Sequence, residues 1–92
     1  MKTVHEDIFK AIEDDPAVAE NLRLRAQMMA MLREAIKTRG LTQTAAAELL
    51  NVAQPRISDL ARGKIERFTI DALVNMLARA GIFLEVERRR AA

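Results

Sequence analysis

The sequence predicts an all-α domain of five helices followed by one short β-strand. Apolar residues recur at spacings of three and four along most of the chain, which is the period of amphipathic helices. Single glycines, Gly40, Gly63 and Gly81, stand where such segments end. After Gly81 the period changes to alternation, which is typical of a strand with one polar face.

The helices follow one another with short connections. The first ends at Asp14-Asp15-Pro16, because the residue before a proline disfavours helical geometry. Thr69 is expected to cap the last helix by accepting a backbone N–H from its first turn. The expected helices cover residues 1–16, 17–39, 42–50, 54–62 and 69–80. We therefore divide the chain into an N-terminal helical segment (1–16), a domain (17–81), and a strand with a basic tail (82–92).

The composition excludes several classes of function. The 92 residues include no cysteine and one histidine, so disulfide scaffolds, zinc ribbons and thiolate chemistry are excluded. No nucleophile–base pair, metal cluster or phosphate-cradling glycine loop is recognisable, so we expect no enzyme, no metal and no cofactor. No signal peptide or membrane span is apparent, and a cytoplasmic protein is expected.

Charge is distributed unevenly along the chain. Residues 1–20 carry two lysines against six acidic residues, whereas residues 21–92 carry thirteen basic against seven acidic residues. A basic body favours a polyanionic partner, and the acidic start is expected to lie away from that surface.

The segment 41–64, LTQTAAAELLNVAQPRISDLARGK, predicts two short helices joined by a tight turn. Ala46 and Ala47 allow the helices to approach closely, and Asn51 suits a left-handed turn. In the second helix only Ile57 and Leu60 are large apolar residues at core spacing. Its outward groups would come from Gln54, Arg56, Ser58, Asp59 and Arg62. A helix of this kind suits insertion into a major groove of DNA.

This stretch resembles the helix-turn-helix of the XRE (phage repressor and Cro-like) family. The matching residues are Leu41, Thr42, Gln43, Ala46, Ala47, Leu50, Asn51, Val52, Ile57, Ser58, Leu60, Gly63 and Lys64. The closing run GKIERFTIDALVNMLARAGIFLEVE is similar to small HigA-like antitoxins, which act with a ribonuclease toxin. The resemblance implies a lambda repressor-like fold.

The resemblance also implies individual roles. Gln43 would bond a DNA phosphate, and Gln54 would read a base edge, since glutamine pairs with adenine. Arg56 and Ser58 would contact the DNA backbone or neighbouring bases, and Arg62 and Lys64 would reach phosphates. The full implied DNA-binding set is Gln43, Thr44, Gln54, Pro55, Arg56, Ser58, Asp59, Arg62 and Lys64.

Two positions depart from the family pattern. Ala53 replaces a serine or threonine cap, a loss that Pro55 partly offsets because its fixed φ suits a first helical turn. Asp59 stands where the family often reads bases. It would either accept from a cytosine amino group or pair with Arg56 or Arg62 one turn away, and we favour the intrahelical pair.

The long helix carries two apolar stripes. The first contains Leu22, Ala26, Met29, Leu32 and Ile36, and the second contains Leu24, Met28, Met31 and Ala35. One stripe must face the core. The other is interpreted as covered by Ile8, Phe9 and Ile12 of the N-terminal segment, or alternatively as a protein-interaction face.

The strand needs a partner for its backbone groups. We predict that residues 82–88 pair with the same strand of a second copy, which would place two recognition helices about 34 Å apart. Pairing with Lys2 to Val4 is the alternative. The predicted dimer interface consists of Ile82, Phe83, Leu84, Glu85 and Val86.

The sequence thus predicts a sequence-specific transcriptional repressor that binds a palindromic operator in double-stranded DNA as a homodimer. The family resemblance implies the antitoxin of a type II toxin–antitoxin pair that represses its own operon, with a ribonuclease toxin as partner and no membrane association. Two alternatives stay open. They are a stand-alone XRE regulator and a protein-interaction module that does not bind DNA.

Overall fold

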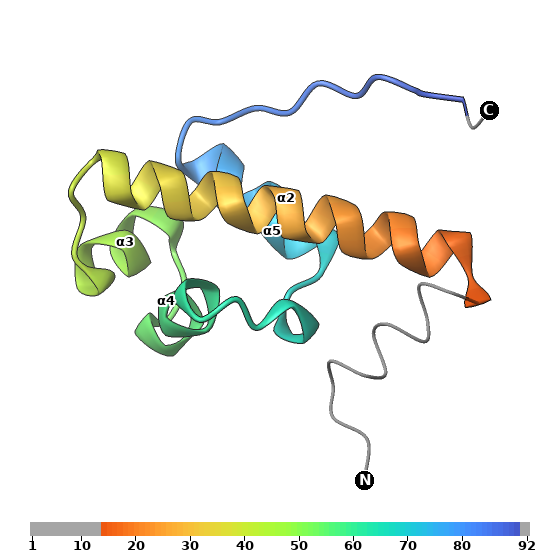
Figure 1. Ribbon diagram of the computed structural model, residues 1–92. Helices are drawn as coiled ribbons and strands as arrows, with labels where there is room; N and C mark the ends of the chain where they lie inside the picture. Colours follow the sequence, from red (N-terminus) through yellow and green to blue (C-terminus); the bar gives the residue numbers. More distant parts are fainter. Residues whose placement is uncertain (1–13, 91–92) are drawn as a thin grey trace, which may run out of the picture.

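The computed structural model describes residues 14–90, which form a bundle of α-helices with one short 3₁₀ turn (Figure 1). The elements are α2 (Pro16–Thr38), α3 (Gln43–Leu50), α4 (Gln54–Ala61), η1 (Ile65–Arg67) and α5 (Ile70–Arg79). Four of the predicted helices are therefore confirmed. The predicted count of five is not, because Val4, Ile8 and Ile12 of the first helix lie outside the described residues.

The helix ends follow the local sequence. Asp15 caps α2 by accepting from the backbone nitrogen of Ala17 at 2.9 Å. Thr42 and Thr69 cap α3 and α5 in the same way, each at 3.1 Å. The cap predicted at Thr69 is confirmed, whereas Ala53 at the start of α4 makes no side-chain cap.

The long helix α2 is the support on which the other elements pack. It contacts α5, η1 and α4, while α3 packs on α4 and α5 (Figure 1). A single hydrophobic core lies between them. Its buried residues are Met28, Met29, Leu32, Ala46, Ala47, Leu50, Ile57, Leu60, Phe68, Leu73, Met76, Leu77 and Ala80.

The two predicted stripes of α2 do not divide into one buried and one surface face. Met29 and Leu32 of the first stripe are buried, but Ala26 is exposed. Met28 of the second stripe is buried in the same core, and Leu24 remains 37% exposed. The elements α4, η1 and α5 all pack against α2, so its buried face is wider than a single stripe. The residues expected to cover the second stripe lie outside the described part of the chain.

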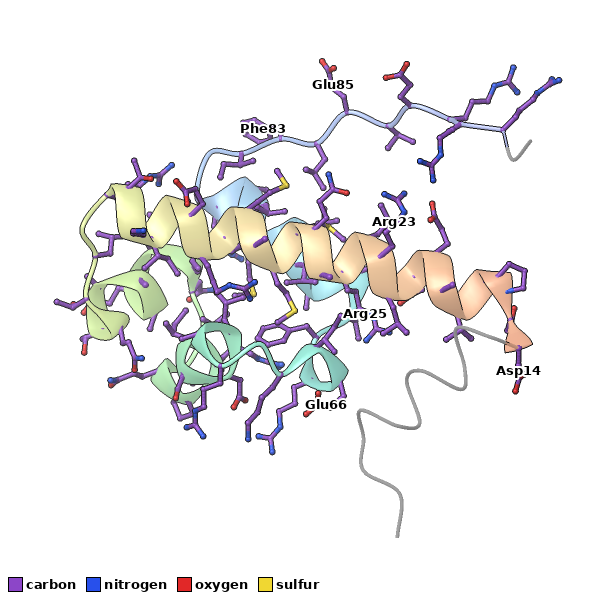
Figure 2. All side chains as sticks on the ribbon, in the orientation of Figure 1. Asp14, Arg23, Arg25, Glu66, Phe83 and Glu85 are labelled. Carbon is purple, nitrogen blue, oxygen red and sulfur yellow. The ribbon has the colours of Figure 1, made fainter. Side chains whose placement is uncertain are left out.

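The predicted C-terminal strand is wrong for the single chain, because residues 14–90 contain no strand. After Ile82, whose backbone nitrogen donates to Leu77 at 2.9 Å, the chain runs back above α2 as a separate segment (Figure 1). Phe83 and Glu85 lie on this segment (Figure 2), and Phe83 is 79% exposed. Alternating residues indicate which side of a segment is apolar, but a strand also requires a second strand to bond with.

A groove of about 340 Å³ lies between this C-terminal segment and the helices α2 and α5. Its apolar lining comes from Leu24, Met28, Met31, Ile70, Val74, Leu84 and Val86. Val86 is 98% exposed. We call this feature the C-terminal groove.

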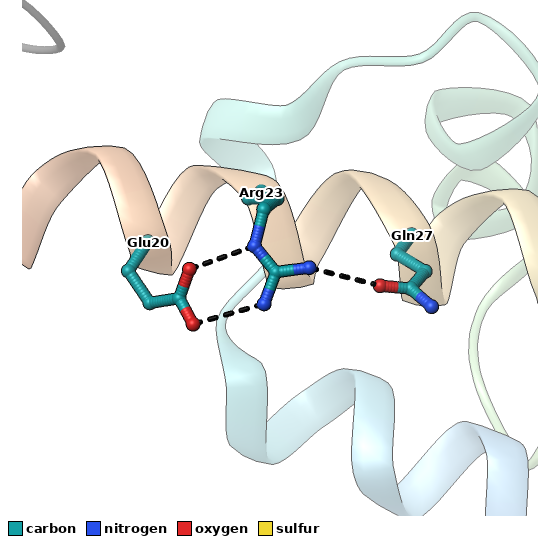
Figure 3. Close-up of polar contacts among 3 residues, drawn as sticks. All are labelled: Glu20, Arg23 and Gln27. Atoms are coloured by element: carbon teal, nitrogen blue, oxygen red, sulfur yellow. Dashed lines mark hydrogen bonds and ion pairs between the residues drawn. The ribbon is translucent and has the colours of Figure 1, made fainter. Parts of the chain in front are cut away.

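A charged pair lies beside the C-terminal groove on α2 (Figure 3). Arg23 donates to both carboxylate oxygens of Glu20, at 2.7 and 2.9 Å, and to the side-chain oxygen of Gln27 at 3.5 Å. The bonds from Arg23 lower the pKa of Glu20 below its usual value of 4.5. Within the described residues, no helix has the length and apolar character needed to cross a membrane.

Candidate nucleic-acid interface

The second helix of the 41–64 segment, α4, is fastened to the core by one narrow side. Ile57 and Leu60 are 2% and 1% exposed and pack in the core beside α3, where Ala46 is fully buried. Asn51 makes the turn between α3 and α4 with a left-handed φ of 55°, as predicted. The remaining side chains of α4 are exposed or half-buried.

Most of the predicted site residues meet in one shallow hollow of about 500 Å³ on this surface. The lining residues are Gln43, Gln54, Pro55, Ser58, Asp59, Arg62, Lys64 and Arg67. Seven of them belong to the predicted set of nine, and Arg67 was not predicted. Two predicted residues, Thr44 and Arg56, do not line the hollow. We call this feature the α4 hollow.

Arg56 does not point outwards as the sequence suggested. Its guanidinium carbon lies 5.3 Å from the centre of the Phe68 ring, and its Nη1 donates to the carbonyl oxygen of Arg67. Phe68 itself is 1% exposed. A cation over an aromatic face and a bond to a backbone carbonyl both fix the side chain in place. Arg56 therefore braces α4 against the segment that leads into α5.

The favoured pairing of Asp59 within its own helix is wrong. Asp59 pairs instead with Arg67 of η1, at 3.4 Å, and Arg62 donates to the hydroxyl of Ser58 at 2.9 Å. Gly63, with a φ of 68°, adopts a conformation that side chains disfavour and turns the chain after α4. The turn brings η1 beside α4, so the partner comes from a different element.

Two arginines of α2 bond to backbone carbonyls of α4 and of the η1 region. Arg33 donates to the carbonyl of Leu60 at 3.2 Å, near the end of α4. Arg25 extends from α2 toward η1 (Figure 2) and donates to the carbonyls of Ile65 and Phe68, at 3.1 and 3.3 Å. Carbonyls at a helix C-terminus lack partners within the helix and favour cations. The sequence analysis missed both arginines, since neither belongs to a recognisable motif.

The α4 hollow is basic overall. Arg62, Lys64 and Arg67 contribute three positive charges, against one negative charge from Asp59. Gln54 at the start of α4 is exposed and supplies both amide donors and an acceptor. Among residues 14–90 no group of acidic or histidine side chains could hold a metal ion. The positive charge suits an elongated polyanion, and the Gln54 amide suits a ligand that exposes hydrogen-bond donors and acceptors along its length.

The comparisons with known proteins agree with this geometry. A family described as "Helix-turn-helix domain" matches residues 11–88. The chain belongs to this helix-turn-helix family. A solved structure named "Putative XRE Family Transcriptional Regulator" is similar with a TM-score of 0.73 and 29% sequence identity, over 79% of this chain and 82% of that chain. No curated protein matches the sequence.

These matches support the predicted XRE-type helix-turn-helix. The family and the fold are those of DNA-binding regulators, which are not enzymes. The finer resemblance to HigA-like antitoxins is not confirmed by either match.

Proposed function

We propose that this helix-turn-helix protein is a sequence-specific transcriptional repressor that inserts α4 into the major groove of an operator. The observation that carries the proposal is the α4 hollow, which gathers Gln54, Arg62 and Lys64 with the other lining residues on the exposed side of α4. Phosphate contacts set register and affinity, whereas amide contacts with base edges supply sequence information. Gln54 is assigned the base contact, and Arg62 and Lys64 are assigned phosphates.

The test is fluorescence anisotropy on the DNA upstream of the protein's own gene and on a scrambled duplex, over a salt series. We expect tight binding to the upstream duplex alone and a steep loss of affinity as salt rises. Weak and equal binding to both duplexes would favour the protein-interaction module instead.

Substitutions separate the two kinds of contact. Gln54→Ala should cost about 1–3 kcal/mol on the upstream duplex and relax preference at one base pair. Lys64→Ala should weaken binding to both duplexes and reduce the salt slope by about one. An equal loss on every duplex for Gln54→Ala would contradict its role in base recognition.

The proposed repressor acts as a homodimer on a palindrome, with residues 82–86 at the interface. The C-terminal segment supports this, because Phe83 and Val86 are exposed at 79% and 98% and no strand pairs with it among the described residues. Pairing with a second copy would bury these exposed apolar side chains and give the backbone groups of the segment hydrogen-bond partners. Sedimentation at micromolar concentration is expected to give a dimer, and a folded monomer would contradict it.

We also propose that the protein is the antitoxin of a toxin–antitoxin pair, with the α2 side of the C-terminal groove, at Leu24 and Met31, as the candidate toxin surface. The sequence resemblance and the exposed apolar lining of that groove support the proposal. Co-purification with the product of a toxin-sized adjacent gene, tested with wild-type protein and with Leu24→Asp, is the decisive measurement. A gene without such a neighbour would favour the stand-alone regulator.

A further inference from the structure

One acidic side chain lies within the otherwise basic α4 hollow. Asp59 of α4 and Arg67 of η1 form an ion pair at 3.4 Å, and both side chains line the hollow. The Asp59 side chain is 16% exposed, and the Arg67 side chain is 55% exposed. The pair therefore lies at the surface that would face DNA.

Such a pair works against a polyanion in two ways. It neutralises Arg67, which would otherwise be available to a phosphate, and its carboxylate repels phosphates nearby. The Arg67 side chain is 55% exposed, so it can exchange Asp59 for a phosphate at the surface, whereas the 16% exposed carboxylate then needs another donor. The pair can therefore act on a bound ligand as well as on folding.

We propose that Arg67 leaves Asp59 for a phosphate when cognate DNA binds, and that Asp59 thereby sets the preference for cognate over other DNA. On the cognate site the freed carboxylate accepts a hydrogen bond from a cytosine amino group. On other sequences the carboxylate finds no such donor, and Arg67 stays paired because a desolvated carboxylate without a partner is unfavourable. The inference rests on the proposed DNA-binding function.

The experiment compares four proteins on the upstream duplex and the scrambled duplex: wild type, Asp59→Asn, Arg67→Ala and the double variant. Glu34→Gln is the matched control, because it removes one negative charge from the exposed side of α2 beside Ile82, outside the α4 hollow. Asp59→Asn should bind the scrambled duplex about five-fold more tightly, the upper end for an ion pair at a protein surface. Its salt slope should steepen by about 0.9, the value for one added phosphate contact.

The affinity for the upstream duplex should rise less than that for the scrambled duplex. The preference of Asp59→Asn for the upstream duplex therefore falls. In the Arg67→Ala background, Asp59→Asn should still relieve repulsion but should no longer steepen the salt slope on the scrambled duplex, because no Arg67 cation remains to bind the extra phosphate. The proposal is overturned if Asp59→Asn matches Glu34→Gln in the wild-type background. It is also overturned if the steeper salt slope persists without Arg67, or if the affinities for both duplexes rise equally.

Failure of this inference can be distinguished from failure of the proposed function. The coupling between Asp59 and Arg67 is measured on the scrambled duplex alone, and it does not require a preference for the upstream DNA. Equal binding of wild type to both duplexes contradicts the proposed function and the assigned specificity, while the coupling is still measured. Absence of binding to either duplex at about 50 mM salt, where phosphate contacts are strong, contradicts both.

Discussion

Replacing Arg56 by alanine should destabilise the fold rather than delete a base contact. The change removes the cation over the Phe68 ring, at 5.3 Å, and the bond to the Arg67 carbonyl. The first contact is worth about 0.5–1 kcal/mol and the second, being exposed, about 0.5–1.5 kcal/mol. We therefore expect a loss of about 1–2.5 kcal/mol in the free energy of unfolding.

The assay is urea denaturation followed by circular dichroism at the helical band. Arg62→Ala is the matched control, because Arg62 also belongs to the α4 region, but within residues 14–90 its side chain bonds to Ser58 alone, four residues earlier. That pair is expected to contribute about 0.2–0.5 kcal/mol. Arg56→Lys keeps a cation near the ring and should recover part of the loss. Equal losses for Arg56→Ala and Arg62→Ala would refute the bracing role.

DNA binding supplies an independent readout of the same residue. Arg56→Ala should weaken binding to the upstream duplex without changing the salt slope, since the guanidinium is not assigned to a phosphate. A decrease in slope of about one for Arg56→Ala would instead identify a direct phosphate contact.

Three further predictions concern the helix ends and the charged pair on α2. Ala53→Ser should add the cap that Thr42 and Thr69 provide elsewhere, raising stability by about 0.5–1 kcal/mol and the melting temperature by several degrees. Gly63→Ala should cost about 1 kcal/mol in urea denaturation, purely from the positive φ, because no atom lies within 4 Å of the added Cβ. The Glu20 carboxyl should titrate below its usual 4.5 in an NMR pH series, since its pKa is lowered by Arg23, and Arg23→Gln should restore it. With a lowered folded-state pKa, the contribution of this pair to stability is present above the ordinary glutamate pKa and is lost as pH falls through the folded value. An unshifted Glu20 titration would contradict the bond geometry in Figure 3.

Features set by neighbouring residues were predictable from the sequence. The left-handed turn at Asn51 and the cap at Thr69 depend on a few consecutive residues, and both are confirmed. The burial of Ile57 and Leu60 follows from helical period, because no other large apolar side chain of α4 competes for the core.

Features that depend on a second element were not predictable in this way. Asp59 and Arg56 find partners in Arg67 and Phe68, eight to twelve residues away, only because the chain turns at Gly63. The same limit applies to residues 82–88. Their alternation of apolar and polar side chains shows which side of the segment is apolar, but not which strand it pairs with. The shared face of the α4 residues that line the hollow was predictable because the motif fixes it, whereas their hydrogen-bond partners were not.

The narrow attachment of α4 to the core has a consequence for the evolution of this protein. Ile57 and Leu60 fasten the helix, while Gln54, Ser58 and Arg62 make no contact that the core requires. Exposed positions of this kind tolerate substitution with little change in stability. Mutations can therefore accumulate on one side of a helix while the other side keeps it folded, so the surface that we propose reads DNA can change over generations without unfolded intermediates.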